Sequence, residues 1–352
     1  GKTMDNLFLI RTLTAAINGM KAPSRKVYNR LFAPREHMEM SDRLAFDIIT
    51  GNETILGNIS VTAPATVTDK TTRKTVTMTA PRVAQKRFIS TADLNAVRQF
   101  GKQMMVELMK NRIATEQKDM RGIIDRTLEF WAVNALKGQI LDADLSTVLV
   151  DYNVDATHEP VLTASGDWEA VWTDTTNADP IRKIRAWQRL IEDDCGATIT
   201  SWLAYIGYEV MDALLAHSSI RDLLKRDKGS QMAENGRIER LAEVEIEEYN
   251  GSFLDLTGTR RRFIGSDEFL LVGICDDLVD CPYAPVVDDD APNGVGNITA
   301  RGQGQLFFSK SWKEKDPSGR WVKAEARPLP VLQRPGAVVR ARPVGVLLME
   351  DD

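Results

Sequence analysis

The chain has 352 residues, with 45 Lys and Arg against 50 Asp and Glu, so its net charge is -5 at pH 7. Apolar residues make up 43% and charged residues 27%, a balance typical of folded soluble proteins that excludes collagen, coiled-coil rods and disordered tails. A pI near 5.5 argues against a general nucleic-acid-binding protein, and the length predicts about two domains.

Residues 1–40 have the composition of an arm. Residues 5–17 have the apolar spacing of a short helix, and Gly19 follows as a stop. The basic residues 21–35 include Pro23 and Pro34 and have little to bury on their own. We therefore expect this segment to be extended and docked on another surface.

The first 90 residues also differ in charge from the rest of the chain. They hold 14 Lys and Arg against 7 Asp and Glu, whereas the remaining residues hold 31 against 43. Opposite charges of this kind orient docking. The basic segment therefore either folds back on its own chain or reaches a neighbouring copy, and charge alone does not distinguish the two.

Residues 41–90 have the pattern of a polar hairpin, with Gly51 and Gly57 in its turn region. Strands are expected at 44–49, 59–62, 65–68 and 74–79. Eight of the twenty residues at 61–80 are threonine, which forms strands but adds little to a core. Such a hairpin is marginal in water. It is either an edge hairpin of one domain or a projection that lies on another surface.

Residues 93–137 have helical apolar spacing after the N-terminal cap sequence at 90–93. A continuous helix of this length would measure roughly 68 Å, which exceeds the diameter of about 53 Å expected of a compact chain of this size. The sequence therefore predicts a flat or elongated chain whose surfaces other copies cover. The helix could break at Gly101, at Gly122 or in the polar residues 115–119.

The remainder of the chain predicts an α+β body. Helices are expected from Asp179-Pro180 to Gly196, at 209–215 and at 220–226. Strands are expected at 148–150, 201–206, 243–248, 269–274, 306–308, 320–326 and 338–346, with a hairpin at 253–264 and a loop at 276–296.

No motif indicates an active site, a cofactor or a metal centre. The candidate metal ligands are His37, His158, His217, Cys195, Cys275 and Cys281. None has a partner at metal-ligand spacing, so we expect structural or surface histidines and buried or half-buried thiols in a chain made in a reducing cytoplasm. No apolar stretch approaches the roughly 18 residues that span a bilayer.

Several short segments, in a characteristic order, resemble those of a known family. They are Phe46–Ile49 with Gly51, Ala80–Arg87, Leu136–Gly138, Trp168 before Asp179-Pro180, Gly251–Gly258, Ser311-Trp312, Asp316-Pro317 and Pro328–Val331. Together with the sequence of basic arm, polar hairpin, long helix and α+β body, they resemble the major capsid protein E family of tailed phages, the lambda type. Each motif is weak alone, and the specificity lies in their order and spacing over nearly the whole chain.

This resemblance implies the Hong Kong 97-like capsid fold and no catalysis. The implied parts are an N-terminal arm at 1–40, an E-loop β-hairpin at 41–90, a P-domain at 91–178 with a spine helix at about 93–137, an A-domain at 179–310, and C-terminal strands at 311–352. The implied function is that of a major capsid protein of a tailed double-stranded DNA bacteriophage, which forms hexamers and pentamers of an icosahedral head around the genome.

The resemblance also implies partners and a location. The chain would contact copies of itself, a decoration or cement protein, a scaffold and a portal, and would touch packaged double-stranded DNA non-specifically, with no membrane partner. It would assemble in the bacterial host cytoplasm and reside in the virion. Two alternatives stay open: an encapsulin-like protein compartment with the same fold, and a soluble enzyme with an unrecognised site.

The E-loop hairpin is expected to lie across a neighbour's spine helix. Five basic residues would face acidic patches there: Arg73, Lys74, Arg82, Lys86 and Arg87. Hexamers and pentamers need slightly different contacts from one chain, so the arm and the hairpin should hinge while the body stays rigid. Gly51 and Gly57 are the hinge candidates, although they fit ordinary turn glycines equally well.

Overall fold

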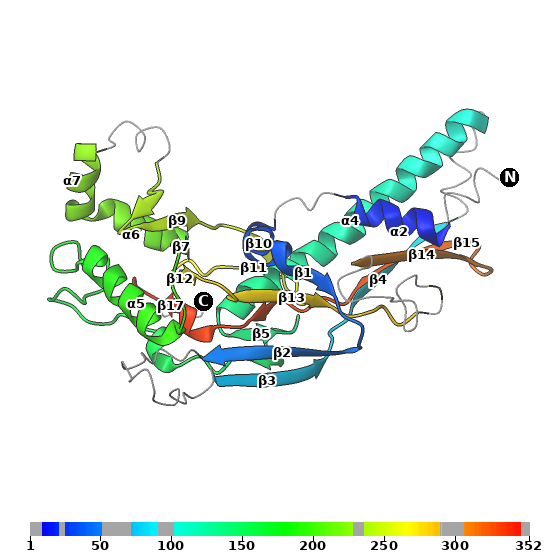
Figure 1. Cartoon of the computed structure of the whole chain (residues 1–352). Helices are drawn as coiled ribbons and strands as arrows, with labels where there is room; N and C mark the ends of the chain where they lie inside the picture. Colours follow the sequence, from blue (N-terminus) through cyan, green and yellow to red (C-terminus); the bar gives the residue numbers. More distant parts are fainter. Residues whose placement is uncertain are drawn as a thin grey trace, which may run out of the picture. The chain divides into compact units, whose positions relative to one another are not determined.

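The computed structural model describes residues 9–20, 25–50, 72–90, 102–227, 236–288, 290 and 306–345 (Figure 1). The chain divides into two units, each assembled from segments that lie far apart in sequence. Unit 1 takes in 1–46, 76–132 and 279–331, and unit 2 takes in 47–75, 133–278 and 332–352. Long-range contacts therefore hold each unit together.

The arm of unit 1 begins its described part with helix α2 at Ile10–Asn18. The helix buries Leu13 and Ile17, two of the residues on the predicted apolar face, and ends at Gly19. Its first predicted turn lies outside the described residues.

The second half of the segment at 21–35 is helical, which corrects the expectation of an extended chain. A short π-helix, η1, spans Tyr28–Phe32, and a 3-10 turn, η2, spans Ala33–Arg35. Tyr28 and Phe32 are four residues apart, fully buried, and stacked with 6.1 Å between ring centres. Residues four apart are neighbours on a helical turn but lie about 13 Å apart along a strand, so the contact between these two rings favours a helical turn.

Two strands form a ribbon, β2 at Arg43–Thr50 and β3 at Thr72–Thr79. They confirm the strands predicted at 44–49 and 74–79. Residues 51–71, with the other predicted strands and both hinge candidates, lie outside the described residues.

A three-stranded antiparallel sheet in unit 1 has the order β14-β15-β4. Its strands are β14 at Phe307–Glu314, β15 at Gly319–Ala326 and β4 at Val83–Ser90. Trp321 of β15 lies 5.0 Å from Phe88 and 6.5 Å from Trp312 between ring centres. The sequence did not predict β4, because this polar segment is a strand only through its pairing with β15.

The long helix is α4, at Lys102–Leu136. It is unbroken at Gly122 and at 115–119, while Gly101 and the predicted start at 93 lie outside the described residues. Its 35 residues correspond to about 52 Å. Gly138 follows with φ +96°, and a Cβ there would lie 2.7 Å from a Val154 methyl, so this position requires glycine.

A second sheet has the order β1-β13-β16. Its strands are β1 at Glu36–Met38, β13 at Val279–Tyr283 and β16 at Val331–Leu332. Strand β13 corrects the expectation of an uninterrupted loop at 276–296. Its residues Cys281 and Tyr283 are fully buried, and this packing overrides the weak strand propensity of an Asp- and Pro-containing segment.

Unit 2 contains a five-stranded mixed sheet in the order β17-β12-β7-β9-β8. The strands are β7 at Ser201–Ile206, β8 at Arg240–Leu241, β9 at Val244–Glu248, β12 at Phe269–Ile274 and β17 at Val338–Ala341. β7 and β9 are parallel, whereas β12 is antiparallel to both β7 and β17. All but β8 lie within predicted strands, and β17 is shorter than predicted.

Three helices accompany this sheet: α5 at Pro180–Cys195, α6 at Tyr208–Ala216 and α7 at Ser218–Asp227. The predicted ends of α5 are confirmed, since the Asp179 side chain accepts a hydrogen bond from the Arg182 amide and Gly196 has φ +63°. Trp187 of α5 lies 5.6 Å from Phe269 of β12 between ring centres, which fixes the helix on the sheet.

Unit 2 also contains two hairpins and two short turns. They are β5 at Gln139–Leu141 with β6 at Val148–Asp151, β10 at Ser252–Leu254 with β11 at Arg260–Arg262, and the 3-10 turns η3 at Ala156–His158 and η4 at Pro335–Ala337. The β10–β11 hairpin confirms the predicted turn near Thr257-Gly258.

Candidate assembly surfaces

Four polar side chains of α4 form a ladder that we call the arm anchor. They are Gln117, Arg121, Asp125 and Glu129, and each is 5% exposed or less. Residues four apart share one face of a helix, so the ladder is a single buried polar stripe. Buried polar groups need partners. Within the ladder, Arg121 Nε donates to Asp125 at 2.8 Å, and the arm of the same chain supplies further partners.

The first two rungs of the arm anchor hold helix α2 by its carbonyl groups. Gln117 Nε2 donates to the Leu13 carbonyl at 3.0 Å, and Arg121 Nη1 donates to the Ile17 carbonyl at 3.0 Å. The Ile17 carbonyl lies in the last turn of α2, where backbone oxygens lack partners within the helix. The arm anchor therefore supplies a donor that the end of α2 needs, and a second donor to the Leu13 carbonyl one turn earlier.

The last two rungs hold the segment around η1. Asp125 lies 3.4 Å from the Arg25 guanidinium, and the Glu129 carboxylate accepts from the amides of Val27 and Tyr28 at 3.0 Å each. A carboxylate is favoured at the amino end of a helical turn. The described arm thus folds back on its own chain. Of the two arrangements that the charge pattern allowed, folding back or reaching a neighbouring copy, these residues adopt the first.

Replacing Glu129 by Gln is expected to loosen the arm. The amide has one acceptor oxygen, so its NH2 group would face a backbone donor, and we expect a loss of about 1–3 kcal/mol in the free energy of unfolding. Hydrogen exchange at the Val27 and Tyr28 amides should accelerate. Glu243→Gln, at an exposed position, is the matched control, and unchanged exchange in the Glu129 variant would contradict the anchor.

Arg82 of β4 binds a residue of its own sheet. Its Nε and Nη2 donate to the two carboxylate oxygens of Glu325 at 2.7 and 2.8 Å. Burial raises the pKa of Glu325, but the hydrogen bonds from Arg82 and Lys323 outweigh it and hold that pKa below its usual value. Arg82 therefore neutralises a fully buried charge.

Lys86 and Arg87 also contact their own chain. The Lys86 Nζ lies 4.5 Å from the centre of the Trp321 ring. Arg87 Nη1 donates to Glu116 at 2.9 Å and to Asp119 at 3.2 Å, and the hydrogen bond to Glu116 raises the pKa of Arg87. Contact of these residues with a neighbour would have to compete with these interactions.

The ribbon carries the other two candidate contact residues, Arg73 and Lys74. Both are exposed. The Arg73 guanidinium lies 3.6 Å from the Asp47 carboxylate, with side chains 56% and 32% exposed, and such a surface pair contributes about 0–1 kcal/mol. These two residues are therefore available to another molecule at little cost to their own unit.

The exposed face of α4 between 110 and 126 is basic. Its exposed cations are Lys110, Arg112, Lys118 and Arg126. Within this described stretch Asp119 is the exposed carboxylate, while Glu116 is bound by both Arg87 and Arg112. This face does not favour the hypothesis that ribbon cations meet acidic patches on a neighbouring spine helix. An acidic partner for the ribbon is better sought elsewhere on a neighbour.

The candidate metal ligands occupy structural positions. His158 is buried and hydrogen-bonded to Asp194 and to the Val338 carbonyl at 2.9 and 2.8 Å. The three cysteines are buried thiols that form no disulfide. Within the described ranges, no group of three or more His, Cys, Asp or Glu side chains could hold a metal ion. None of the helices described is long and apolar enough to cross a membrane.

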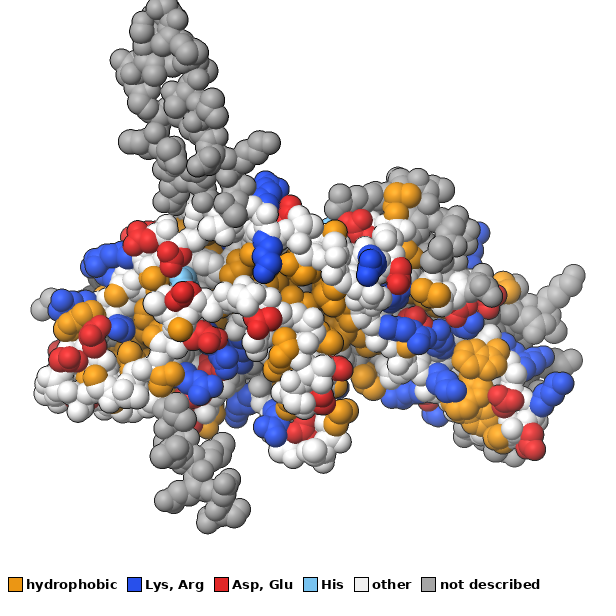
Figure 2. All heavy atoms as spheres, turned by 90° about the horizontal axis from the view of Figure 1, so that it is seen from below, with side chains coloured by type: hydrophobic (Ala, Val, Ile, Leu, Met, Phe, Trp, Pro, Cys, Tyr) orange, Lys and Arg blue, Asp and Glu red, His pale blue; other side chains and the backbone are white. Residues whose placement is uncertain are grey.

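The surface carries exposed hydrophobic side chains among charged ones. In Figure 2, basic and acidic side chains lie among hydrophobic side chains that reach solvent. Among the described residues, the exposed large hydrophobic side chains include Leu256, Leu254, Val287 and Met40. Single exposed apolar side chains are ordinary on a protein surface, but Leu254 and Leu256 lie two residues apart on one hairpin.

Solved structures show the class of fold. A prophage protein of Escherichia coli CFT073, described as a capsid protein, matches with TM-score 0.64 and 18% identity over 95% of this chain and 98% of that chain. A phage-related protein of Bordetella bronchiseptica RB50 matches with TM-score 0.54 and 11% identity over 97% and 99%. The capsid of cyanophage P-SCSP1u matches with TM-score 0.50 and 10% identity over 88% of this chain and 85% of that chain. The chain has the α+β, Hong Kong 97-like phage capsid fold.

The family model of the phage major capsid protein E matches residues 10–342. The chain belongs to this family and is a major capsid protein of a tailed phage. It is therefore a structural protein, a virion component that assembles with copies of itself into a shell. The curated proteins include no match to this sequence.

Proposed function

We propose that this chain builds the icosahedral head of a tailed double-stranded DNA bacteriophage from hexamers and pentamers that enclose the genome. The family match over 10–342 carries the proposal. A single chain can occupy both kinds of ring if flexible segments adjust their contacts while packed units move as rigid bodies.

The E-loop hairpin at 41–90, which contains the ribbon, is our candidate for the main contact between copies. Arg73 and Lys74 would meet acidic residues of a neighbour, and Gly51 and Gly57 would let the hairpin bend. The exposure of Arg73 and Lys74 supports this role. Arg82, Lys86 and Arg87 remain candidate contacts that would exchange partners within the chain for partners on a neighbour.

The other proposed partners follow from enclosing a genome. The exposed cations of α4 are suited to non-specific contact with DNA phosphates, which requires charge but no base recognition. A scaffold, a portal and a decoration or cement protein would complete the head, and assembly would take place in the bacterial host cytoplasm. No catalytic step is part of this proposal.

Light scattering and electron microscopy of the expressed chain test the proposal. We expect large closed particles with five- and six-fold rings. When particles are made during infection, their contents should be nuclease-protected double-stranded DNA. A discrete small oligomer would point to a soluble enzyme, and shells filled with protein cargo would point to an encapsulin-like compartment; either result would overturn the proposal.

A further inference from the structure

The β10–β11 hairpin presents apolar and cationic side chains together. Leu254 and Leu256 are 61% and 75% exposed, and Arg260 and Arg262 are exposed on the facing strand. The turn between the strands is well ordered by Asp255, whose carboxylate accepts from the Thr257 and Thr259 amides at 2.9 Å each. The hairpin is thus a preformed projection that needs little ordering to bind.

The charges of Arg260 and Arg262 are not neutralised within the described part of the chain. Arg260 donates to the Ser252 hydroxyl at 3.1 Å, and Arg262 donates to the Asn250 side chain at 3.1 Å and lies over the Tyr208 ring at 4.8 Å. These partners are neutral. Arg261, by contrast, is paired with Asp255 at 2.7 Å.

The carboxyl end of α5 carries the opposite charge. Glu192 and Asp193 are exposed there, and their negative charges are repelled by the negative end of the helix dipole. Asp194, the next residue, is engaged by His158, whereas Glu192 and Asp193 have no cationic partner among the described residues. Arg334 donates to the Cys195 and Gly196 carbonyls at this helix end, but among the described residues it pairs with neither Glu192 nor Asp193, so these two carboxylates are available to cations of another molecule.

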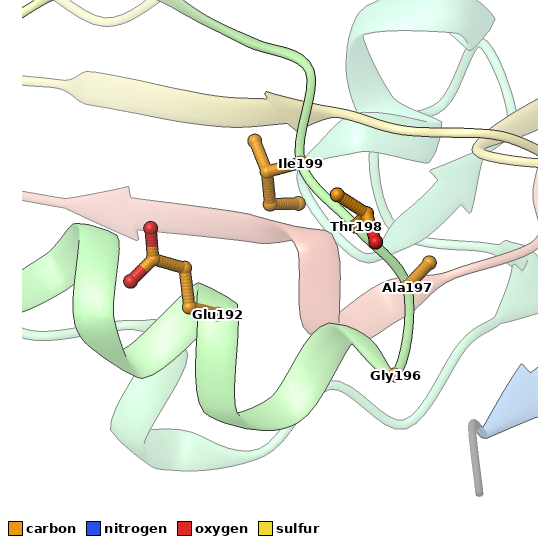
Figure 3. Close-up of a pocket in the computed structure, with 5 residues that line it drawn as sticks. All are labelled: Glu192, Gly196, Ala197, Thr198 and Ile199. Atoms are coloured by element: carbon orange, nitrogen blue, oxygen red, sulfur yellow. The ribbon is translucent and has the colours of Figure 1, made fainter. Parts of the chain in front are cut away.

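A pocket opens beside these carboxylates. It is lined by Glu192, Gly196, Ala197, Thr198 and Ile199. Figure 3 shows Glu192 on the helix and Thr198 and Ile199 on the segment that returns beside it. The pocket has a volume of about 480 Å³, enough for an apolar side chain, and its carboxylate at one side and apolar groups at the other match the mixed character of the hairpin.

The hairpin and the pocket lie at opposite ends of two neighbouring strands of the five-stranded sheet, β7 and β9. The pocket precedes the start of β7 at Ser201, and β9, which is parallel to β7, leads into the hairpin. The six residues of β7 correspond to about 20 Å. Two different patches separated in this way on one unit can join copies head to tail, which is the geometry that closes a ring.

We propose that the β10–β11 hairpin of one copy docks at the α5 pocket of the next copy. Leu256 enters the pocket beside Ala197 and Ile199, and Arg260 and Arg262 pair with Glu192 and Asp193. The proposal rests on the proposed shell function and specifies one of its contacts. A second copy is the favoured occupant because phosphates of DNA would satisfy the arginines but leave Leu256 uncovered.

Charge reversal and charge exchange test this contact in the full chain. Arg260→Glu with Arg262→Glu, and Glu192→Arg with Asp193→Arg, should each lower the fraction of chains in closed shells about tenfold or more, because like charges would meet at every repeat of the contact. Combining all four substitutions restores opposite charges and should return the yield to within about threefold of wild type. Sedimentation velocity and electron microscopy measure the yield.

Each other outcome has a distinct meaning. Circular dichroism and the Tm of the dispersed variants should match wild type, since all four residues are exposed; Leu256→Ser, which adds no charge, should also lower shell yield. Failure of the combined variant to recover, or normal shells from the arginine variant, would overturn the contact. Normal shells that hold less DNA would assign the hairpin to DNA instead. Absence of shells from wild type would count against the proposed function itself.

Discussion

Chains that carry Arg73→Glu and Lys74→Glu are expected to fold and stay soluble but fail to close shells. Both side chains are exposed, and the pair that Arg73 makes with Asp47 at 3.6 Å is a surface pair, so the loss in unfolding free energy should be at most about 1 kcal/mol. Each contact between copies that the ribbon makes would instead become repulsive. Because a closed shell repeats each contact many times, a small penalty per contact has a large effect on assembly.

A tenfold weakening of each contact, about 1.4 kcal/mol, compounds over the shell, so we expect closed particles to be nearly absent. Sedimentation velocity and negative-stain microscopy measure this loss. Lys313→Glu with Lys315→Glu makes the same change in net charge at two exposed positions of unit 1 and should assemble as wild type does. Normal particles from the ribbon variant would contradict a role of Arg73 and Lys74 in assembly.

Glu268→Gln is expected to destabilise unit 2 by about 3–5 kcal/mol, the cost of breaking a buried ion pair. Glu268 is 3% exposed. Its carboxylate lies 2.5 Å from Lys137 Nζ, accepts from Arg340 Nε at 3.0 Å, and accepts from the Gly265 amide at 2.8 Å. The glutamine would leave Lys137 without its anion and would leave Arg340 only the more distant Glu159 carboxylate, at 3.8 Å.

The two partners of this pair respond differently to burial. Burial lowers the pKa of Lys137 more than Glu268 raises it, so the ammonium gains no net benefit. Burial raises the pKa of Glu268, but the opposite effect of Lys137 and Arg340 is larger. The net result is a pKa of about 2, against an ordinary 4.5. We therefore assign the stabilisation to the carboxylate, which has two cations and a backbone donor.

The depressed pKa of Glu268 makes the stability of unit 2 sensitive to acid. A group with a lowered folded-state pKa contributes fully above its unfolded value and loses its contribution as pH falls through the folded value. As the pH falls from about 4.5 to 2, the free energy of unfolding of wild type should therefore decrease by about 3 kcal/mol. The Glu268→Gln variant lacks this contribution at every pH.

Urea denaturation of dispersed chains across this pH range measures both effects. Glu169→Gln is the matched control, because its partner Lys183 lies at 2.8 Å but the Glu169 side chain is 47% exposed, and we expect a loss of at most about 1 kcal/mol there. Equal losses in the two variants, or a wild-type curve that is flat from pH 4.5 to 2, would contradict the account of Glu268.

Local signals in the sequence predicted the elements whose ends and faces are set locally. Helix α5 has Asp179 and Pro180 at its start and Gly196 at its end, and β12 is a continuous apolar run. Strand β4 and strand β13 have no such signals, since charged residues interrupt one and proline the other. Their pairing with β15 and β1 decides their structure, and partners distant in sequence are not visible from a single chain.

The arm anchor illustrates a signal that was present but not used. Gln117, Arg121, Asp125 and Glu129 repeat every four residues, so a polar stripe on α4 could be seen in the sequence. Whether such a stripe faces water or a partner depends on packing, which the sequence of the helix alone does not show. Likewise, the pairing of Arg87 with Glu116 depends on where β4 lies relative to α4, which no local pattern fixes.

A cryo-electron microscopy reconstruction of particles assembled from the expressed chain tests most directly whether copies complete one another. We predict a closed shell in which the ribbon of each copy, with Arg73 and Lys74, lies on an adjacent copy, while α4 keeps its own arm bound through the arm anchor. Solitary chains, or a shell in which every ribbon packs only on its own chain, would contradict this account.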